Sequence, residues 1–190
     1  MNKLLKLRSW KLFLLIYGPG IISFAVFISA FIRLSVPNIT LYMTGITLTN
    51  TFFMIWAYLA GKSLYEKLPL KNNFQYVLYR FNILFVTIYM CLFSLLSIKQ
   101  FSRMGLISGL TAVIPVLHMY GMFAGFYIMY FLSKTLVSVE KKTIAVFRDY
   151  AGEFFLLWFF PIGLWILQPR IAGVLEKNEE IDKQDTITET

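Results

Sequence analysis

Apolar residues in this chain are gathered into long runs that are separated by short polar connections. The runs are Leu12–Ile32, Met43–Gly61, Phe81–Ile98, Gly105–Ser133 and Phe154–Leu167. A hydrocarbon core about 30 Å thick is crossed by a helix of roughly 20 apolar residues, and the first four runs meet or nearly meet that length. The runs lack the alternation of barrel strands, and lipid requires the backbone to be hydrogen-bonded internally. The pattern therefore predicts an all-α protein, a polytopic transmembrane helical bundle.

The fifth run is the shortest and leaves two topologies open. Only fourteen residues lie between Glu153 and Gln168, and Pro161 and Gly163 interrupt them. With Glu153 and Gln168 at opposite interfaces, the run crosses the bilayer and the bundle has five spans. A run of this length is also typical of re-entrant or interfacial segments. The alternative is therefore four spans plus a re-entrant or interfacial last helix.

Lys and Arg alternate between connections, which predicts the orientation of the chain. Four precede the first run, one lies in Arg33–Tyr42, four lie in Lys62–Arg80, two in Lys99–Met104 and four in Lys134–Gly152. Basic connections are retained on the cytoplasmic side. We therefore expect a multi-pass protein of the bacterial inner (cytoplasmic) membrane, with its N-terminus in the cytoplasm.

Composition supports the membrane class and bounds the domain organisation. Of the 190 residues, 58% are hydrophobic and 15% are charged, against about 25% charged residues in soluble domains. We predict one bundle over residues 1–170 and an acidic, disordered C-terminal tail over 171–190. The lone Cys91 excludes an intrachain disulfide. The net charge of +8 matches the basic flanks of membrane spans, so we expect a bilayer and no nucleic acid as partner.

Three polar residues within or beside the apolar runs are candidates for function. They are Asn50, His118 and Glu153. An ionisable residue at bilayer depth is a functional hypothesis, because it can relay a proton or line a wet cavity. For His118, the only histidine, the structural alternative is a neutral ring hydrogen-bonded to a neighbouring helix.

The connection Lys134–Tyr150 carries apolar residues at helical spacing. It predicts an amphipathic helix on the cytoplasmic interface, or a helical extension of the fourth run. Asp149 and Glu153 share one helix face, where like charges four residues apart repel each other. We expect Arg148, Lys142 or a bound cation to compensate them.

Small residues and prolines predict where helices pack and bend. In lipid, small residues let helix backbones approach each other closely. Two G-x-x-x-G pairs in the fourth run predict such packing, at Gly105, Gly109, Gly121 and Gly125. Proline removes a backbone hydrogen bond, which predicts kinks at Pro19, Pro115 and Pro161.

The sequence contains no recognisable catalytic motif. H-E-x-x-H, G-x-S-x-G, the Walker lysine loop and C-x-x-C do not occur in it. We therefore expect no enzyme activity, no cofactor and no metal. The remaining expectation is an accessory, scaffold or assembly role in a membrane complex, with other membrane-protein subunits as partners. The alternative is a homo-oligomeric channel or small-solute transporter, with the chain as its own partner.

Overall fold

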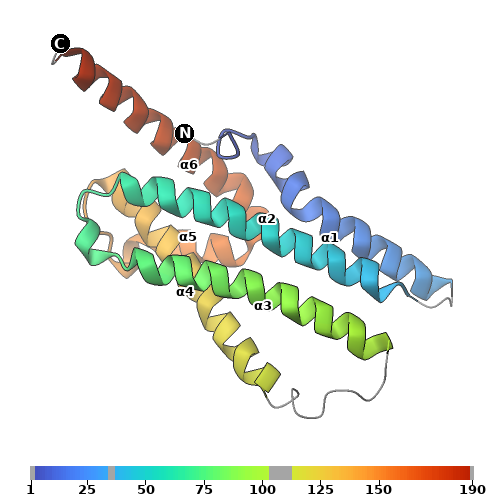
Figure 1. Ribbon diagram of the computed structural model, residues 1–190. Coiled ribbons are helices and arrows are strands. Elements are labelled where there is room, and N and C mark those ends of the chain that lie inside the picture. The colour runs from blue at the N-terminus through green and yellow to red at the C-terminus, as the bar shows by residue number, and fades with distance from the viewer. Residues whose placement is uncertain (1–2, 34–36, 103–112, 189–190) are drawn as a thin grey trace. The chain divides into compact units, whose positions relative to one another are not determined.

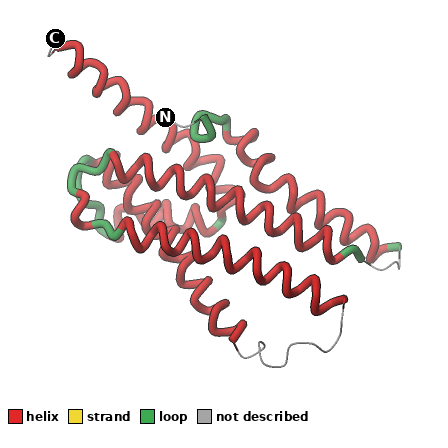
Figure 2. Tube along the Cα trace, viewed as in Figure 1, coloured by secondary structure: helices red, strands yellow, loops and turns green. Residues whose placement is uncertain are grey.

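The computed structural model describes residues 3–33, 37–102 and 113–188, and the elements in these ranges are helices (Figures 1 and 2). In chain order they are α1 (Ser9–Ile32), α2 (Ile39–Glu66), the 3₁₀ turn η1 (Lys71–Asn73), α3 (Tyr76–Ser102), α4 (Val113–Lys141), α5 (Phe147–Trp158) and α6 (Phe160–Thr188). The described residues contain no strand, which confirms the all-α class.

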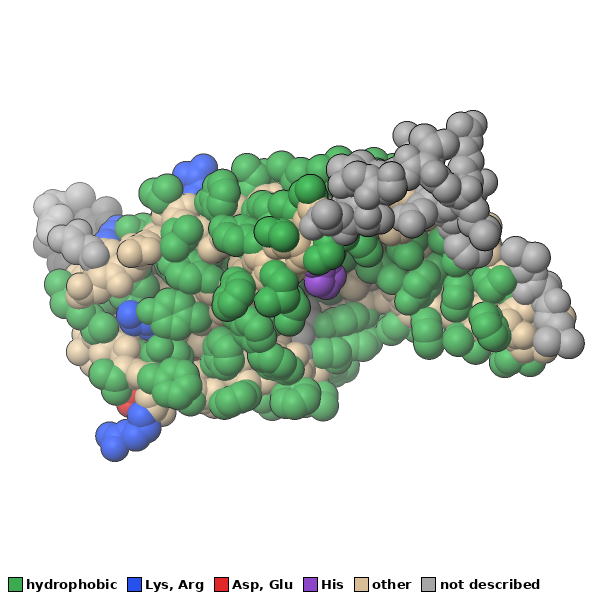
Figure 3. All heavy atoms as spheres, turned by 90° about the horizontal axis from the view of Figure 1, so that it is seen from below, with side chains coloured by type: hydrophobic (Ala, Val, Ile, Leu, Met, Phe, Trp, Pro, Cys, Tyr) green, Lys and Arg blue, Asp and Glu red, His purple; other side chains and the backbone are tan. Residues whose placement is uncertain are grey.

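Three helices are long and apolar enough to cross a membrane. They are α1, α3 as far as Ile98, and α4. Helix α2 has 28 residues but contains five threonines and Asn50, and it is not among the three. Apolar side chains cover most of the face drawn in Figure 3. These features support a membrane protein, whereas the prediction of five spans is not confirmed.

The chain divides into two compact units, and α1 to α4 each contribute a part to both. Unit 1 comprises Met1–Phe13, Trp56–Arg80 and Tyr127–Thr190, and unit 2 comprises Leu14–Ile55 and Phe81–Phe126. All ten Asp and Glu belong to unit 1, and of the 18 Lys and Arg only Arg33, Lys99 and Arg103 belong to unit 2. The connections that the sequence predicted to be cytoplasmic therefore all belong to unit 1. The single bundle predicted for residues 1–170 stays a prediction.

In unit 2, α1 and α2 approach each other at glycines. A Cβ added to Gly45 would overlap the Ser23 side chain and lie 2.7 Å from the Pro19 carbonyl oxygen. Farther along α2, the Thr47 and Ser94 hydroxyls are hydrogen-bonded at 2.5 Å, which joins α2 to α3. The closest approach of two helices described in this unit is therefore possible because Gly45 has no side chain. The hydrogen bond between two small hydroxyl side chains stabilises the packing further.

The core of unit 1 is aromatic. The Tyr79 hydroxyl of α3 donates to the Ala57 carbonyl of α2 at 2.5 Å. Its ring stacks on Phe131 of α4 with 4.1 Å between centroids, and both rings are buried. Gly61 lies against the Tyr79 ring, where a Cβ would overlap it. Tyr79 thus connects three helices: its hydroxyl is hydrogen-bonded and its ring is buried.

Helix α4 ends at Lys141, so the amphipathic helix expected over Lys134–Tyr150 is interrupted. Lys142 adopts φ 53°, a left-handed conformation that ends a helix. The Thr143 amide donates to the Ser138 carbonyl at 3.2 Å, and the Ser138 hydroxyl accepts from the Ala145 amide at 3.0 Å. These bonds satisfy backbone groups at the turn, and α5 begins after it as a separate helix.

The last apolar run is divided between α5 and α6, with Phe159 between them. Gly163 of α6 lies against the Leu156 backbone of α5, where a Cβ would overlap the carbonyl oxygen. Pro161 is the second residue of α6, a position where a missing amide costs little, so it begins a helix rather than kinking one.

The other two prolines also differ in their surroundings. Pro115 lies in the first described turn of α4, which begins at Val113, whereas Pro19 lies inside α1. The C-terminal segment predicted to be disordered from residue 171 continues α6 as a helix through Thr188. The disordered acidic tail over residues 171–190 stays a prediction.

Substitution of two glycines tests the packing of unit 2. Gly45→Ala adds a methyl group against Ser23 and the Pro19 carbonyl, and overpacking of this kind costs about 1–3 kcal/mol. Gly125→Ala is the matched control, because no atom lies within 4 Å of its added Cβ and alanine favours the helix by up to about 1 kcal/mol. We expect thermal unfolding in detergent to shift down for Gly45→Ala and not for Gly125→Ala. Equal effects would contradict the packing described.

Candidate functional site

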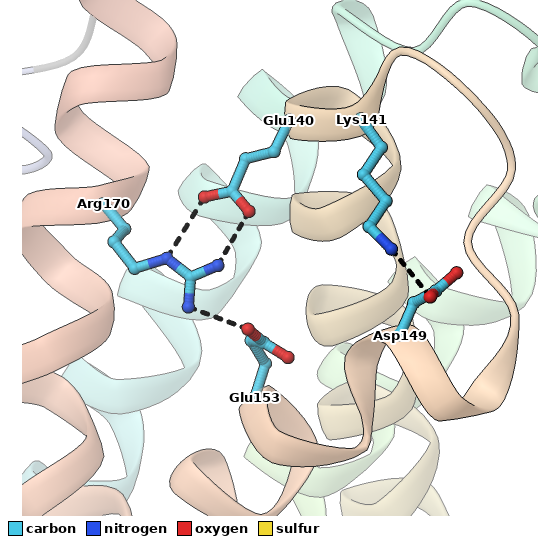
Figure 4. Close-up of polar contacts among 5 residues, drawn as sticks. All are labelled: Glu140, Lys141, Asp149, Glu153 and Arg170. Atoms are coloured by element: carbon cyan, nitrogen blue, oxygen red, sulfur yellow. Dashed lines mark hydrogen bonds and ion pairs between the residues drawn. The ribbon is translucent and has the colours of Figure 1, made fainter.

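Arg170 of α6 forms ion pairs with two carboxylates from two other helices (Figure 4). Its Nε and Nη2 donate to the two Glu140 oxygens at 3.1 and 2.7 Å, at the end of α4. Its Nη1 donates to Glu153 Oε1 at 2.8 Å, within α5. We call these three residues the Arg170 cluster. It ties α4, α5 and α6 together through one guanidinium, whose planar fork suits bidentate pairing.

The Arg170 cluster is partly shielded from solvent. The Arg170, Glu140 and Glu153 side chains are 35%, 25% and 14% exposed. The hydrogen bond to Glu140 and then that to Glu153 raise the pKa of Arg170 above its ordinary value, while burial opposes them. The guanidinium therefore stays protonated, and charge-assisted bonds of this geometry are stronger than those of an exposed pair.

Gln168, one residue before Pro169, makes a second polar connection in unit 1. Its Oε1 accepts from the Trp56 indole at 2.8 Å. Its Nε2 donates to the Leu5 and Leu7 carbonyls at 2.8 and 3.2 Å. The side chain is 1% exposed, and both ends of its amide are satisfied, as a buried polar group requires. Gln168 thus joins α6 to α2 and to the segment that precedes α1.

A small cavity adjoins the Arg170 cluster. Glu153 lines it together with apolar side chains that include Trp56, Leu136 and Leu167. Its volume is about 10 Å³, which is room for about one water molecule. This cavity is therefore too small for a solute larger than water.

Asp149 has its own cation beside the Arg170 cluster. Lys141 Nζ lies 2.7 Å from Asp149 Oδ1, and Asp149 Oδ2 accepts from the Val146 amide at 3.1 Å. The hydrogen bond from Lys141, and then that from Val146, lower the pKa of Asp149. Asp149 and Glu153 are thus paired with Lys141 and Arg170. Of the cations expected from the sequence, Arg148 also lowers the pKa of Asp149 through its charge, by less than the hydrogen bond from Lys141 does.

The structure gives the three polar candidates different surroundings. Glu153 belongs to the Arg170 cluster in unit 1. In unit 2, His118 Nδ1 is 3.0 Å from the Tyr89 hydroxyl of α3, and its side chain is otherwise exposed. This bond joins α4 to α3, and the role of His118 stays a prediction. Asn50 is half-buried, and its Oδ1 is buried with no hydrogen-bond partner among the described residues.

The predicted glycine pairs are not the sites of closest approach. Gly121 lies against the Tyr89 ring, with its added Cβ 3.6 Å away, which is an ordinary contact. Gly125 has no atom within 4 Å of such a Cβ among the described residues, and helix packing there stays a prediction. Gly105 and Gly109 lie outside the described residues. The closer approaches involve Gly45, Gly61 and Gly163.

Sequence reasoning found Glu153 but missed both of its partners in the Arg170 cluster. No spacing rule links Arg170 to residues 17 and 30 positions earlier. Glu140, near the end of the fourth helix, carried no signal of its own. Within the described ranges, no group of three or more His, Cys, Asp or Glu could hold a metal ion.

Replacing the guanidinium tests how much the Arg170 cluster stabilises unit 1. Arg170→Gln leaves two carboxylates without their cation, and we expect it to lower the free energy of unfolding by about 2 kcal/mol or more. The matched control is Lys62→Gln, because Lys62 and Glu66 are 4.0 Å apart and both more than half exposed, and such a pair contributes less than about 1 kcal/mol. Chemical denaturation in detergent measures both. Similar small losses would show that the cluster stabilises little.

The lowered pKa of Asp149 predicts a stability that depends on pH. Because the folded pKa lies below the ordinary 3.8, the ion pair stabilises the fold above that value and its contribution is lost as pH falls through the folded pKa. Asp149→Asn keeps an acceptor for Val146 and removes the charge. We expect it to unfold at a lower temperature than the parent at pH 7 and at the same temperature near pH 2. A constant difference across this range would contradict the assignment.

Comparison with known proteins identifies no relative of this chain. No protein-family model matches the chain, and neither the curated proteins nor the solved structures contain a match. The functional argument therefore rests on the residues and contacts described above.

Proposed function

We propose that this chain is an accessory or assembly subunit of a membrane complex, without catalytic activity. The observation that carries the proposal is the pairing of Arg170 with Glu140 and Glu153. Charges arranged in this way stabilise the joining of helices and are not free to bind a solute. Together with the Gln168 bonds they give unit 1 a fixed arrangement of charged and polar groups, which suits contact with other subunits.

The distribution of charge supports membrane embedding with unit 1 at a membrane surface. The segments of unit 2 contain no acidic residue, while unit 1 contains most of the cations. Because connections rich in Lys and Arg are retained on the cytoplasmic side of a membrane, we propose that the N-terminus lies in the cytoplasm of a bacterial cell. We further propose that α1 to α4 are four crossings. The length of α2, its position between two candidate spans and its hydroxyl bond to α3 support its inclusion.

The alternative function is a homo-oligomeric channel or small-solute transporter. Asn50 favours it, because a buried amide oxygen without a described partner is available to a solute, to water or to a second copy. His118 and Glu153, the other candidates for such a path, have the partners described above. The alternative therefore has less support than the accessory role.

The composition of the native particle distinguishes these functions. After gentle extraction from the native membrane, we expect native mass spectrometry to find this chain together with other subunits in fixed stoichiometry. A closed homo-oligomer of this chain alone would contradict the accessory role. Ion flux would then be measured for the parent and for His118→Ala and Asn50→Ala at equal expression, with Tyr89→Phe as the control that removes only the bond to His118.

A further inference from the structure

We propose that α5 and the first half of α6 form a re-entrant hairpin that enters only the leaflet on the side of the N-terminus. Its occupant is the acyl region of that leaflet, and the chain after Arg170 returns to the side from which it entered. This inference rests on the membrane placement proposed above and not on the accessory role.

The ion pairs of Arg170 require the chain to fold back. An unbroken helix would separate residues 153 and 170 by about 25 Å along its axis. Instead, Arg170 Nη1 and Glu153 Oε1 are 2.8 Å apart. The helix break at Phe159 and the contact of Gly163 with Leu156 provide the reversal. Glu153 and the chain near Gln168, which a full crossing would put at opposite interfaces, therefore lie at one level.

Several polar contacts locate the base of this hairpin at the N-terminal side. Glu140, bound to Arg170, lies in the last turn of α4, a candidate membrane span. Gln168 binds the carbonyls of Leu5 and Leu7, which precede α1, another candidate span. The N-terminal segment and the end of α4 both carry the Lys and Arg expected at a cytoplasmic surface.

The tip of the hairpin presents large apolar side chains. The exposed fraction is 55% for Phe155, 62% for Phe159 and 65% for Ile162, and about half for Trp158 and Trp165. A charged base with an exposed apolar and aromatic tip is the arrangement that a lipid interface stabilises. Large exposed apolar patches of this kind indicate a membrane or a protein partner. The ion pair between Arg170 and Glu140, which lies at the end of a candidate membrane span, favours the membrane.

The length of the hairpin limits how far it reaches. At 1.5 Å per residue, the axial distance is about 8 Å from Glu153 to Trp158 and about 15 Å from Phe160 to Arg170. A hydrocarbon core is about 30 Å thick, so the tip extends at most to its middle. Trp165, about 8 Å along the helix axis from Arg170, then lies in the outer part of one leaflet, where tryptophan is favoured. The acidic residues after Leu175 end on the side of the N-terminus.

Cysteine accessibility in sealed vesicles tests this topology. In a Cys91→Ser background, Lys3→Cys reports the N-terminal side, Ser35→Cys reports the connection expected on the opposite side, and Gly173→Cys and Thr190→Cys report the returning chain. Gly173 is exposed with no atom near its added Cβ, so substitution there leaves the Arg170 cluster intact. The probe is a membrane-impermeant maleimide, applied to right-side-out and inverted vesicles.

We expect Gly173→Cys and Thr190→Cys to react in the same vesicles as Lys3→Cys, and Ser35→Cys to react only in vesicles of the other orientation. If Gly173→Cys and Thr190→Cys instead react together with Ser35→Cys, the last run crosses the bilayer and the proposal is wrong. The labelling pattern does not depend on other subunits. If native mass spectrometry contradicts the accessory role, the labelling result is therefore unaffected. If the labelling contradicts the hairpin, the accessory role is likewise unaffected.

Discussion

The pairing of one guanidinium with two carboxylates is the constraint on which the arrangement of unit 1 depends. Glu140, Glu153 and Arg170 come from three helices, and each carboxylate is costly to shield from water unless a cation accompanies it. Arg170 supplies that cation to both. If α6 moved away, two partly shielded negative charges would remain on α4 and α5. The reversal of the chain after α5 is therefore stabilised by charge as well as by the contact between Gly163 and Leu156.

Apart from this pairing, each unit is stabilised internally by a different kind of contact. In unit 1, buried polar groups such as the Gln168 amide and the Tyr79 hydroxyl form hydrogen bonds with other segments. These bonds are directional, so they fix how the segments are oriented, which apolar burial alone does not. In unit 2, the described contacts include close backbone approach at Gly45 and a hydroxyl pair, Thr47 with Ser94. This difference follows composition, because the segments of unit 2 have no acidic residue with which to build ion pairs.

The sequence predicted the helices well and their partners poorly. Long apolar runs require helices in lipid, and the alternation of Lys and Arg predicts which connections share a side, which stays a prediction. The contacts of Gly45 and Gly125 could not be ranked, because the G-x-x-x-G spacing records only that small residues share a face. Glu153 was identified from its charge beside an apolar run. Its partner Arg170 was not, because their contact needs a reversal at Phe159 that no helical periodicity encodes.

The same reversal explains why the fifth apolar run looked like a short span. Its apolar residues, from Phe154 to Leu167, are continuous in sequence, but Glu153 and Arg170 on either side of them carry opposite charges that meet in the fold. A segment that crosses a bilayer separates its flanking charges by the thickness of the hydrocarbon core, so they cannot form an ion pair. Flanking charges that attract each other instead favour a hairpin, because the apolar tip can enter lipid while its charged base stays at the surface.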